Sequence, residues 1–256
     1  MSTDPSSYLG FGPYLPGFVK IPYNDIQALK EVIVDPNIAG MLIEPIQGEA
    51  GVVVPADHFL KEAFELCKEN NVLFIADEIQ TGIARTGRML ACDHLDIRPD
   101  ILILGKALSG GILPVSAVLA DDEIMLCIKP GEHGSTFGGN PLACAVAMEA
   151  MQVVQDENLA ENAKLQGAYL RELLNLLANK HSLITTVRGK GLLNAIVIDD
   201  HQESSLAWNL CLKMAEFGLL AKPTHGNIIR FAPPLTITRD QTEEAAGIIE
   251  KSLKSL

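Results

Sequence analysis

The sequence contains no Cys-x-x-Cys pair, and no apolar run in it approaches the length of a transmembrane helix. The cysteines are Cys67, Cys92, Cys127, Cys144 and Cys211. An odd number of scattered cysteines favours a reducing compartment over secretion and argues against a zinc site. Cys92 and His94 are near neighbours, but two potential ligands do not make a metal site. We therefore expect neither a disulfide framework nor a bound metal.

Positive charge is also scarce. The chain has 20 lysines and arginines against 32 aspartates and glutamates, a formal net charge of -12. This balance argues against nucleic acid or an anionic membrane as a partner. Met1 to Ser7 are neither hydrophobic like a signal peptide nor rich in arginine like a mitochondrial presequence. The chain is 48% hydrophobic, enough for the core of one medium domain and a small one.

A phosphate-binding P-loop is absent as well. The segment 73–78, Leu-Phe-Ile-Ala-Asp-Glu, has the form of a strand ending in two acids, and such acids hold magnesium in P-loop nucleotidases. Those enzymes also need the motif Gly-x-x-x-x-Gly-Lys-Ser/Thr. The nearest candidates, 104–107 and 188–191, lack the closing hydroxyl and the spacing. The sequence therefore argues against an ATPase.

A lysine and an aspartate are placed for a different cofactor. Lys106 follows the apolar run 101–104, and Asp77 ends the preceding strand-like run. Pyridoxal phosphate needs an amine to hold its aldehyde as an imine and a carboxylate to keep its ring nitrogen protonated. A lysine just past a strand is usually a surface residue, so each residue alone is weak evidence. Together they suggest a pyridoxal phosphate site.

The loop Gly134 to Pro141, Gly-Ser-Thr-Phe-Gly-Gly-Asn-Pro, opens onto an apolar helix expected from Leu142. Glycines let the backbone approach an anion, the hydroxyls of Ser135 and Thr136 can donate to its oxygens, and a helix start favours negative charge. The alternative is a flexible helix cap. The presence of Asp77 and Lys106 favours phosphate binding.

Alternating strand and helix patterns predict an α/β fold. The first half should contain strands at 40–43, 72–76, 101–104 and 114–119 and a helix at 59–70. Glu49, Asp77 and Lys106 then follow strand ends, where ligands collect in open α/β sheets. The second half should contain helices at 142–155, 159–179 and 240–252, strands at 192–198 and 228–231, and Trp208 in its core. Thr238 and Gln241 have the spacing of a capping box.

Five motifs together are similar to those of the class III aminotransferases, in particular their ornithine-type branch. They are Glu44 to Gly51, Asp77 to Gly82, Arg85 to Arg88, Lys106 to Gly111, and Gly134 to Pro141. The segments 222–226 and 228–235 resemble the ornithine type more than the acetylornithine or 4-aminobutyrate types. The resemblance implies a fold type I pyridoxal-phosphate-dependent transferase. Residues 1–155 would form a large domain with a mostly parallel sheet, here incomplete, and 156–256 a small α+β C-terminal domain.

The resemblance also assigns roles around pyridoxal 5'-phosphate. Lys106 would hold the cofactor and then act as the base that moves the substrate proton. Asp77 would pair with the ring nitrogen, and Gln80 would contact the phenolic oxygen. Ser135 and Thr136 belong to the phosphate loop, and Thr136 resembles the residue that reaches the cofactor of the neighbouring subunit. A homodimer with shared active sites is therefore implied, with Arg85 and Arg88 as structural or interface residues.

The implied reaction transfers the δ-amino group of L-ornithine to 2-oxoglutarate, giving glutamate 5-semialdehyde and glutamate. Arg230 resembles the arginine that binds the α-carboxylate of the diacid, and Glu49 would neutralise it during the ornithine half-reaction. Animal members of the family are mitochondrial, so the matrix is implied, with the cytoplasm as the alternative. Family members are longer, and their first third has no counterpart here. The alternative function is accordingly a shortened product that acts only as partner of a full-length subunit.

Overall fold

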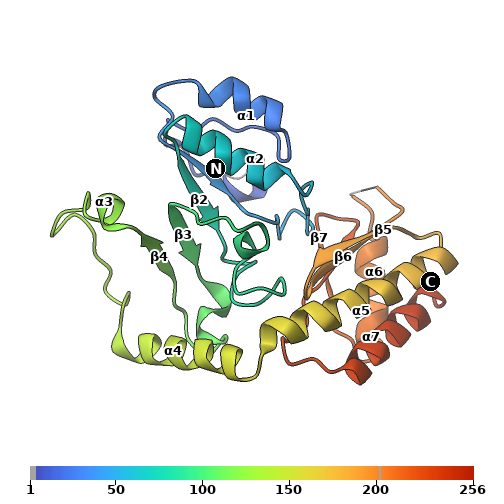
Figure 1. The fold of residues 1–256 in the computed structure, drawn as a ribbon. Coiled ribbons are helices and arrows are strands. Elements are labelled where there is room, and N and C mark those ends of the chain that lie inside the picture. Colours follow the sequence, from blue (N-terminus) through green and yellow to red (C-terminus); the bar gives the residue numbers. More distant parts are fainter. Residues whose placement is uncertain (1–3, 202) are drawn as a thin grey trace.

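A computed structural model describes residues 4–201 and 203–256, which form two four-stranded sheets with helices around them (Figure 1). The first sheet contains β1 (Gly40–Ile43), β2 (Leu73–Asp77), β3 (Ile101–Leu104) and β4 (Ala117–Ala120), in that order. The pairings of β1 with β2 and of β2 with β3 are parallel, whereas β4 is antiparallel to β3. The carboxyl ends of the first three strands therefore lie at one edge of the sheet.

The first half contains the helices η1 (Pro5–Ser7), α1 (Ile26–Ile33), α2 (Phe59–Glu69), η2 (Cys92–Leu95), η3 (Lys106–Ser109), α3 (Asp122–Met125) and α4 (Pro141–Asp156). Those that cover the sheet pack against it in two groups. Residues of α1 and α2, such as Leu29 and Phe59, share a core with Phe74 of β2. Leu108 of η3 shares another core with Ala147 of α4. The short helix that begins at Lys106 is thus fixed between the sheet and α4.

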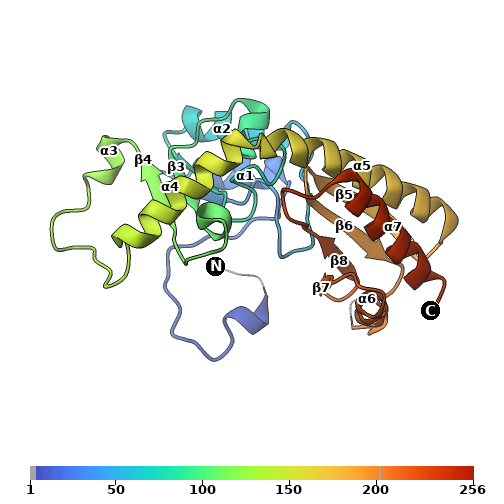
Figure 2. The ribbon, with the colours of Figure 1, turned by 90° about the horizontal axis from the view of Figure 1, so that it is seen from below.

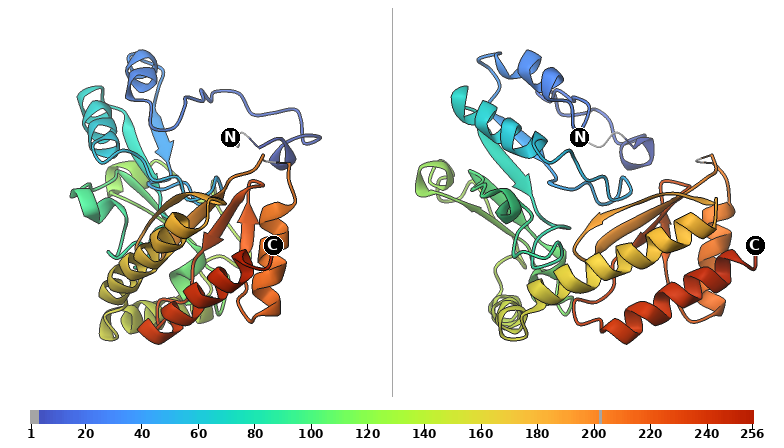
Figure 3. Two further views of the ribbon diagram at one scale, coloured as in Figure 1. Left: turned by 90° about the vertical axis from the view of Figure 1, so that its right-hand side faces the viewer. Right: turned by 45° about the vertical axis from the view of Figure 1, so that its right-hand side comes forward.

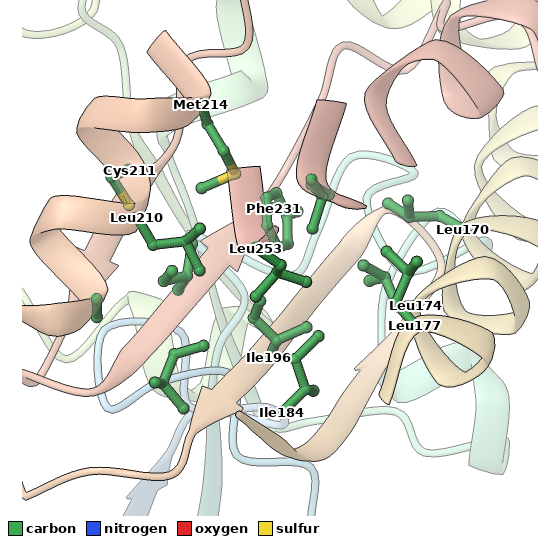
Figure 4. Close-up of a cluster of buried hydrophobic side chains, with 14 residues drawn as sticks. Leu170, Leu174, Leu177, Ile184, Ile196, Leu210, Cys211, Met214, Phe231 and Leu253 are labelled. Carbon is green, nitrogen blue, oxygen red and sulfur yellow. The ribbon is translucent and has the colours of Figure 1, made fainter. Parts of the chain in front are cut away.

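The second sheet is antiparallel throughout, in the order β5 (Ile184–Lys190), β6 (Leu193–Ile198), β8 (Ile228–Phe231) and β7 (Lys222–Thr224). Strand residues alternate between its two faces. Ile196 and Ile229 pack with Leu174 and the rest of a core formed by α5 (Leu159–Lys180), α6 (Leu206–Glu216) and α7 (Arg239–Leu253) (Figures 3 and 4). Ala195 and Ile228 pack instead against Ile46 and Val52 of the first half. One face of this sheet therefore meets the loop after β1.

Most predicted elements are present, and the capping box of Thr238 and Gln241 at the start of α7 is confirmed. The strand predicted at 114–119 runs from 117 to 120. The helices α1 and α3 and the strands β5 and β7 were missed, and α6 was recognised only as a helical pattern around Trp208. The prediction that Trp208 lies in the core is wrong, because its side chain is 54% exposed. It lies in α6, whose buried residues include Leu210 and Met214 but not Trp208. The predicted domain boundary at residue 155 falls in the last turn of α4 and stays a prediction.

Two segments extend away from the sheets. Residues 8–19 at the N-terminal side and the stretch 121–140 around α3 both form long open loops (Figure 2). Both carry exposed apolar side chains, including Phe11, Leu15 and Phe137, which is 83% exposed. Among the helices of the described residues, none is long and apolar enough to cross a membrane.

Candidate active site

The candidate site lies at the carboxyl ends of β1, β2 and β3. Asp77 pairs with Ile103 in the register of β2 and β3, and the N–H of Glu78 donates to the carbonyl of Ile103 at 3.0 Å. Gly105 is extended and buried, and Lys106 follows it at the start of η3. The structure thus brings the ends that carry Asp77 and Lys106 side by side, as the order of strands in the sequence predicts.

The backbone of Lys106 is unusual. Its φ of 43° lies in the left-handed region, which is uncommon for a residue other than glycine. Strained backbone of this kind occurs often at functional sites, where the surrounding structure over-determines it. Within the described residues the exposed Lys106 amine makes no hydrogen bond or ion pair. It is therefore available to a ligand.

Two adjacent acids at the end of β2 have different environments. Asp77 is half-buried, and its Oδ1 accepts a hydrogen bond from the N–H of Ile79 at 3.0 Å, which fixes the carboxylate at the turn. Glu78 is fully buried and accepts from the N–H groups of Ala91 at 3.0 Å and Cys92 at 2.8 Å, and from the Thr81 hydroxyl. Sequence reasoning missed the role of Glu78, although its position beside Asp77 in a strand-end motif was a usable signal.

Glu44 directly follows β1 and is a second acid that sequence reasoning left without a role. Its Oε2 accepts from the N–H of Gly48 at 3.0 Å. Burial raises the pKa of Glu44, and the negative charge of Asp77 raises it further, while Lys106 opposes the shift. The Tyr23 hydroxyl donates to the carbonyls of Glu44 at 3.1 Å and Pro45 at 3.0 Å, which anchors the end of the strand. Glu44 is therefore close enough to Asp77 and to Lys106 for both charges to act on its pKa.

The structure brings Glu49 and Arg230 together although they are distant in sequence. Arg230 Nη1 donates to Glu49 Oε1 at 2.7 Å and to Gln80 Oε1 at 3.2 Å. The hydrogen bond from Arg230 lowers the pKa of Glu49, so the pair is charged near neutral pH. The Arg230 side chain is 19% exposed and that of Glu49 54% exposed. Because the Glu49 carboxylate is largely exposed, breaking its ion pair with the Arg230 guanidinium costs little free energy.

The loop carrying Glu49 is held by the second sheet. Arg188 of β5 donates through Nε at 2.9 Å and Nη2 at 2.7 Å to the carbonyl of Gly51. Gly51 has a φ of 100°, and a Cβ there would lie 2.5 Å from Ile228 Cδ1. Glycine is therefore required for this close approach. The two sheets meet at the site through this loop.

Ser135 and Thr136 do not join the other candidate residues within this chain. They lie in the exposed stretch between α3 and α4, where Ser135 Oγ accepts from the N–H of Gly138 at 2.9 Å. The side chain of Asn140 caps α4 by accepting from the N–H of Ala143 at 2.9 Å. In the part of the chain that the structure describes, Thr136 makes no hydrogen bond to Lys106 or Asp77. The assignment of these two hydroxyls to a cofactor phosphate stays a prediction.

Arg85 is a structural residue. Its Nη1 donates to the carbonyls of Leu192 at 3.2 Å and Pro233 at 2.6 Å, so it ties the turn after β2 to the second sheet. Burial lowers the pKa of Arg85 to about 10. Across residues 4–201 and 203–256 the structure has no cluster of three or more histidine, cysteine or acidic side chains arranged for a metal ion.

Comparison with protein families decides the classification. Residues 1–253 match the family model described as Aminotransferase class-III. The chain belongs to the class III aminotransferases. Members of this family use pyridoxal phosphate, so the predicted family, fold type and cofactor class are confirmed.

Curated relatives of this class III chain include two from animals. A protein named mitochondrial ornithine aminotransferase from Drosophila ananassae is 60% identical over 255 residues, which are 100% of this chain and 58% of the relative. The protein of the same name from Rattus norvegicus is 60% identical over 99% of this chain and 57% of its own length. The chain therefore spans somewhat more than half the length of the curated relatives it matches.

Solved structures give the same picture of the fold. The ornithine aminotransferase from Toxoplasma gondii, described with partial occupancy of pyridoxal phosphate at its active site, has a TM-score of 0.94 at 50% identity, covering 99% of this chain and 59% of that chain. An acetylornithine aminotransferase from Elizabethkingia anophelis has a TM-score of 0.92 at 65% identity, covering 94% of this chain and 64% of that chain. The class III architecture is thus shared by proteins named for two related substrates.

Proposed function

We propose that this chain carries the catalytic lysine and the diacid-binding half of an ornithine aminotransferase, which transfers the δ-amino group of L-ornithine to 2-oxoglutarate. The observation that carries the proposal is the ion pair of Glu49 and Arg230 beside the strand ends of Asp77 and Lys106. Ornithine presents a side-chain amino group, whereas 2-oxoglutarate presents a second carboxylate. Because Glu49 can leave Arg230, the same site can accept either substrate.

The residues at the strand ends fit pyridoxal phosphate. An unpaired amine on a strained backbone and a fixed carboxylate are the donor set that this cofactor needs. Lys106 would hold the group and Asp77 its ring nitrogen, while Gln80 is placed within reach of both Arg230 and Gly48. When bound, the cofactor supplies an aldehyde that condenses with amines and a ring that withdraws electrons.

Lys106 is proposed as anchor and base. Once a substrate amine displaces it, Nζ becomes a free amine that can take the proton from the substrate carbon. The nearby acids Glu44 and Glu49 place negative charge close to Lys106. The carboxylate of Asp77 would keep the ring nitrogen of the cofactor protonated, because a fixed anion in a half-buried site favours the charged form of a basic partner.

Arg230 and Glu49 are proposed to sort the two substrates. The planar guanidinium of Arg230 suits bidentate pairing with the carboxylate of 2-oxoglutarate or glutamate. With ornithine, Glu49 stays on Arg230 and removes the positive charge that would repel a cationic substrate. With the diacid, Glu49 swings away from the guanidinium.

The exposed stretch with Ser135 and Thr136 is proposed to complete the phosphate site of a second subunit. Support comes from its apolar, exposed side chains, which include Phe137 and Ile128, and from its extension away from the sheets. A homodimer with shared sites would bury them. The names of the animal relatives include the word mitochondrial, and we infer the mitochondrial matrix as the compartment.

The first experiment is borohydride reduction of the chain with pyridoxal phosphate, followed by peptide mapping. The pyridoxyl group should be found on Lys106, and its presence on a different lysine would refute the assignment. Absorption spectra before and after L-ornithine, and then after 2-oxoglutarate, test the two half-reactions. A folded chain that takes up no cofactor would favour the alternative, a subunit that works only with a longer partner.

A second candidate substrate is N-acetylornithine, which the 65% identity to the acetylornithine enzyme favours. Acetylation removes the positive charge of the α-amino group and adds an apolar amide. The ratio of kcat/KM for ornithine to that for N-acetylornithine decides between the two. A ratio well above one supports the ornithine assignment, and a ratio well below one supports the acetylated substrate.

A further inference from the structure

Lys222 forms an unusual pair with Arg230. The two residues are direct partners in the antiparallel ladder of β7 and β8, so their side chains start from the same face of the sheet. Like charges directly opposite one another are unfavourable in a sheet. A lysine on an edge strand often serves only to block strand addition. This lysine has a further contact that such a role does not require.

That contact is with Glu49, which lies between the two cations. Glu49 Oε1 is 2.7 Å from Arg230 Nη1, and Glu49 Oε2 is 3.9 Å from Lys222 Nζ. The Lys222 side chain is 69% exposed, whereas that of Arg230 is 19% exposed. One carboxylate thus has a close partner inside the site and a looser partner on the solvent side.

The other charged groups near Glu49 do not offer it a second ion-pair partner. Lys106 also lowers the pKa of Glu49, but it is the proposed cofactor anchor. Glu44 repels Glu49 from the side of the first sheet, and its Oε2 is held by the N–H of Gly48. A carboxylate that leaves Arg230 is therefore drawn away from the first sheet and toward Lys222.

We propose that Lys222 is the second partner of Glu49, which holds this carboxylate aside when Arg230 binds the carboxylate of a dicarboxylic substrate. This inference rests on the proposed function, in which Arg230 binds the carboxylate of that substrate and Glu49 leaves the guanidinium. Lys222 is then a positioning residue that determines specificity: it acts through Glu49 and touches neither substrate. Removing it should favour the closed pair of Glu49 with Arg230 and so weaken dicarboxylate binding.

The test that needs neither cofactor nor substrate is the pKa of Glu49, followed by carbon-13 NMR of labelled glutamate carboxyls in the full chain. Lys222→Gln should raise this pKa slightly when Arg230 is present and by about half a unit or more in the Arg230→Gln background, where Lys222 is the remaining ion-pair partner of Glu49. Lys213→Gln removes an equal charge from a partly exposed lysine that pairs with Glu216 at a distance from the site, so it is the control for the loss of a surface charge. An unchanged Glu49 pKa in the Arg230→Gln background would overturn the proposal.

A double-mutant cycle then tests the consequence for binding. Lys222→Gln should raise KM for 2-oxoglutarate about threefold to fivefold, the size expected for an exposed ion pair, and leave KM for ornithine unchanged or lower. In the Glu49→Gln background it should have no effect on either. An equal loss of 2-oxoglutarate affinity in that background would mean that Lys222 contacts the diacid directly, which overturns the proposal. A wild-type chain that does not turn over 2-oxoglutarate would refute the proposed function, and the pKa cycle would still decide the role of Lys222.

Discussion

Replacing Gly167 with alanine should destabilise the chain through a backbone collision. Gly167 lies in α5, and a Cβ there would be 1.8 Å from the carbonyl oxygen of Gly191 and 2.1 Å from its carbonyl carbon. No rotamer can relieve an overlap between a Cβ and backbone atoms. The Gly191 carbonyl also accepts from Arg171 Nη1 at 2.8 Å and from Asn194 Nδ2 at 3.1 Å. The helix and the turn would have to separate, and both hydrogen bonds would weaken.

The magnitude follows from opposing contributions. Alanine gains about 1 kcal/mol over glycine inside a helix. Overpacking costs about 1 to 3 kcal/mol, and the two weakened hydrogen bonds each cost about 1 kcal/mol or more. The net loss in the free energy of unfolding is therefore about 2 to 4 kcal/mol. For a chain of this size that corresponds to a fall in Tm of about 4 to 16 °C.

Gly247→Ala is the matched control, because Gly247 lies in α7 and is exposed. A Cβ at this position would have no atom within 4 Å outside the backbone of its own helix. It should stabilise the chain by about 0.5 to 1 kcal/mol. Both variants can be compared by thermal and denaturant unfolding, followed by circular dichroism. If Gly167→Ala unfolded at or above the wild-type temperature, the close packing of α5 on the Gly191 turn would be refuted.

Three further predictions concern the site. Asp77→Asn should still take up pyridoxal phosphate but lose most transamination in single-turnover assays, because the amide lacks the charge that keeps the ring protonated; near-normal turnover would exclude the role. Glu78→Ala should cost about 3 kcal/mol in denaturant unfolding, since it leaves two buried N–H groups without a partner; a loss below about 1 kcal/mol would show that water replaces the carboxylate. Gly48→Ala should weaken cofactor binding several-fold in a fluorescence titration, because its Cβ would lie 2.3 Å from Gln80 Oε1 and displace that amide; unchanged affinity would separate Gln80 from the cofactor.

The sequence predicted the strands of the first sheet because they are short, apolar and bounded by turns. The ranges 40–43 and 101–104 agree with β1 and β3, and 228–231 agrees with β8. β3 and β8 lie inside their sheets and β1 lies at an edge, but all three strands are mostly apolar. A short edge strand that contains proline is harder to find from composition. The three-residue β7 contains Pro223, which weakens any strand pattern, and it was missed.

The error at Trp208 has a different cause. A helical pattern around this residue was recognised, and Trp208, the only tryptophan, was predicted to lie in the core. The buried face of α6 is set by Ala207, Leu210, Cys211 and Met214. These four recur at helical spacing, and Trp208 lies outside that set. Counting the whole periodic set would have given the correct face.

Some residues of the candidate site could be predicted from local sequence patterns, whereas others depend on contacts between distant parts of the chain. Asp77 and Lys106 were found because parallel strands place their carboxyl ends together, a rule that needs only the order of elements. Glu49 and Arg230 are 181 positions apart, and no local pattern joins them. Their pairing was expected from the family resemblance alone. Glu44 and Glu78 were overlooked because burial and hydrogen bonding, which distinguish them from surface acids, depend on the tertiary structure.

The loop from Glu44 to Val52 explains why the two sheets must be correctly placed for the site to work. Val52 is fully buried with a φ of 56°, a conformation that a β-branched residue adopts only under constraint. The constraint comes from the second sheet, where Ala195 and Ile228 cover Val52 and Arg188 holds the carbonyl of Gly51. Glu49 reaches Arg230 because this strained loop is pressed onto the open face of that sheet. A small change in the angle between the sheets would therefore alter the Glu49 and Arg230 pair first. It would leave Asp77, which ends β2, and Lys106, which follows β3, in place.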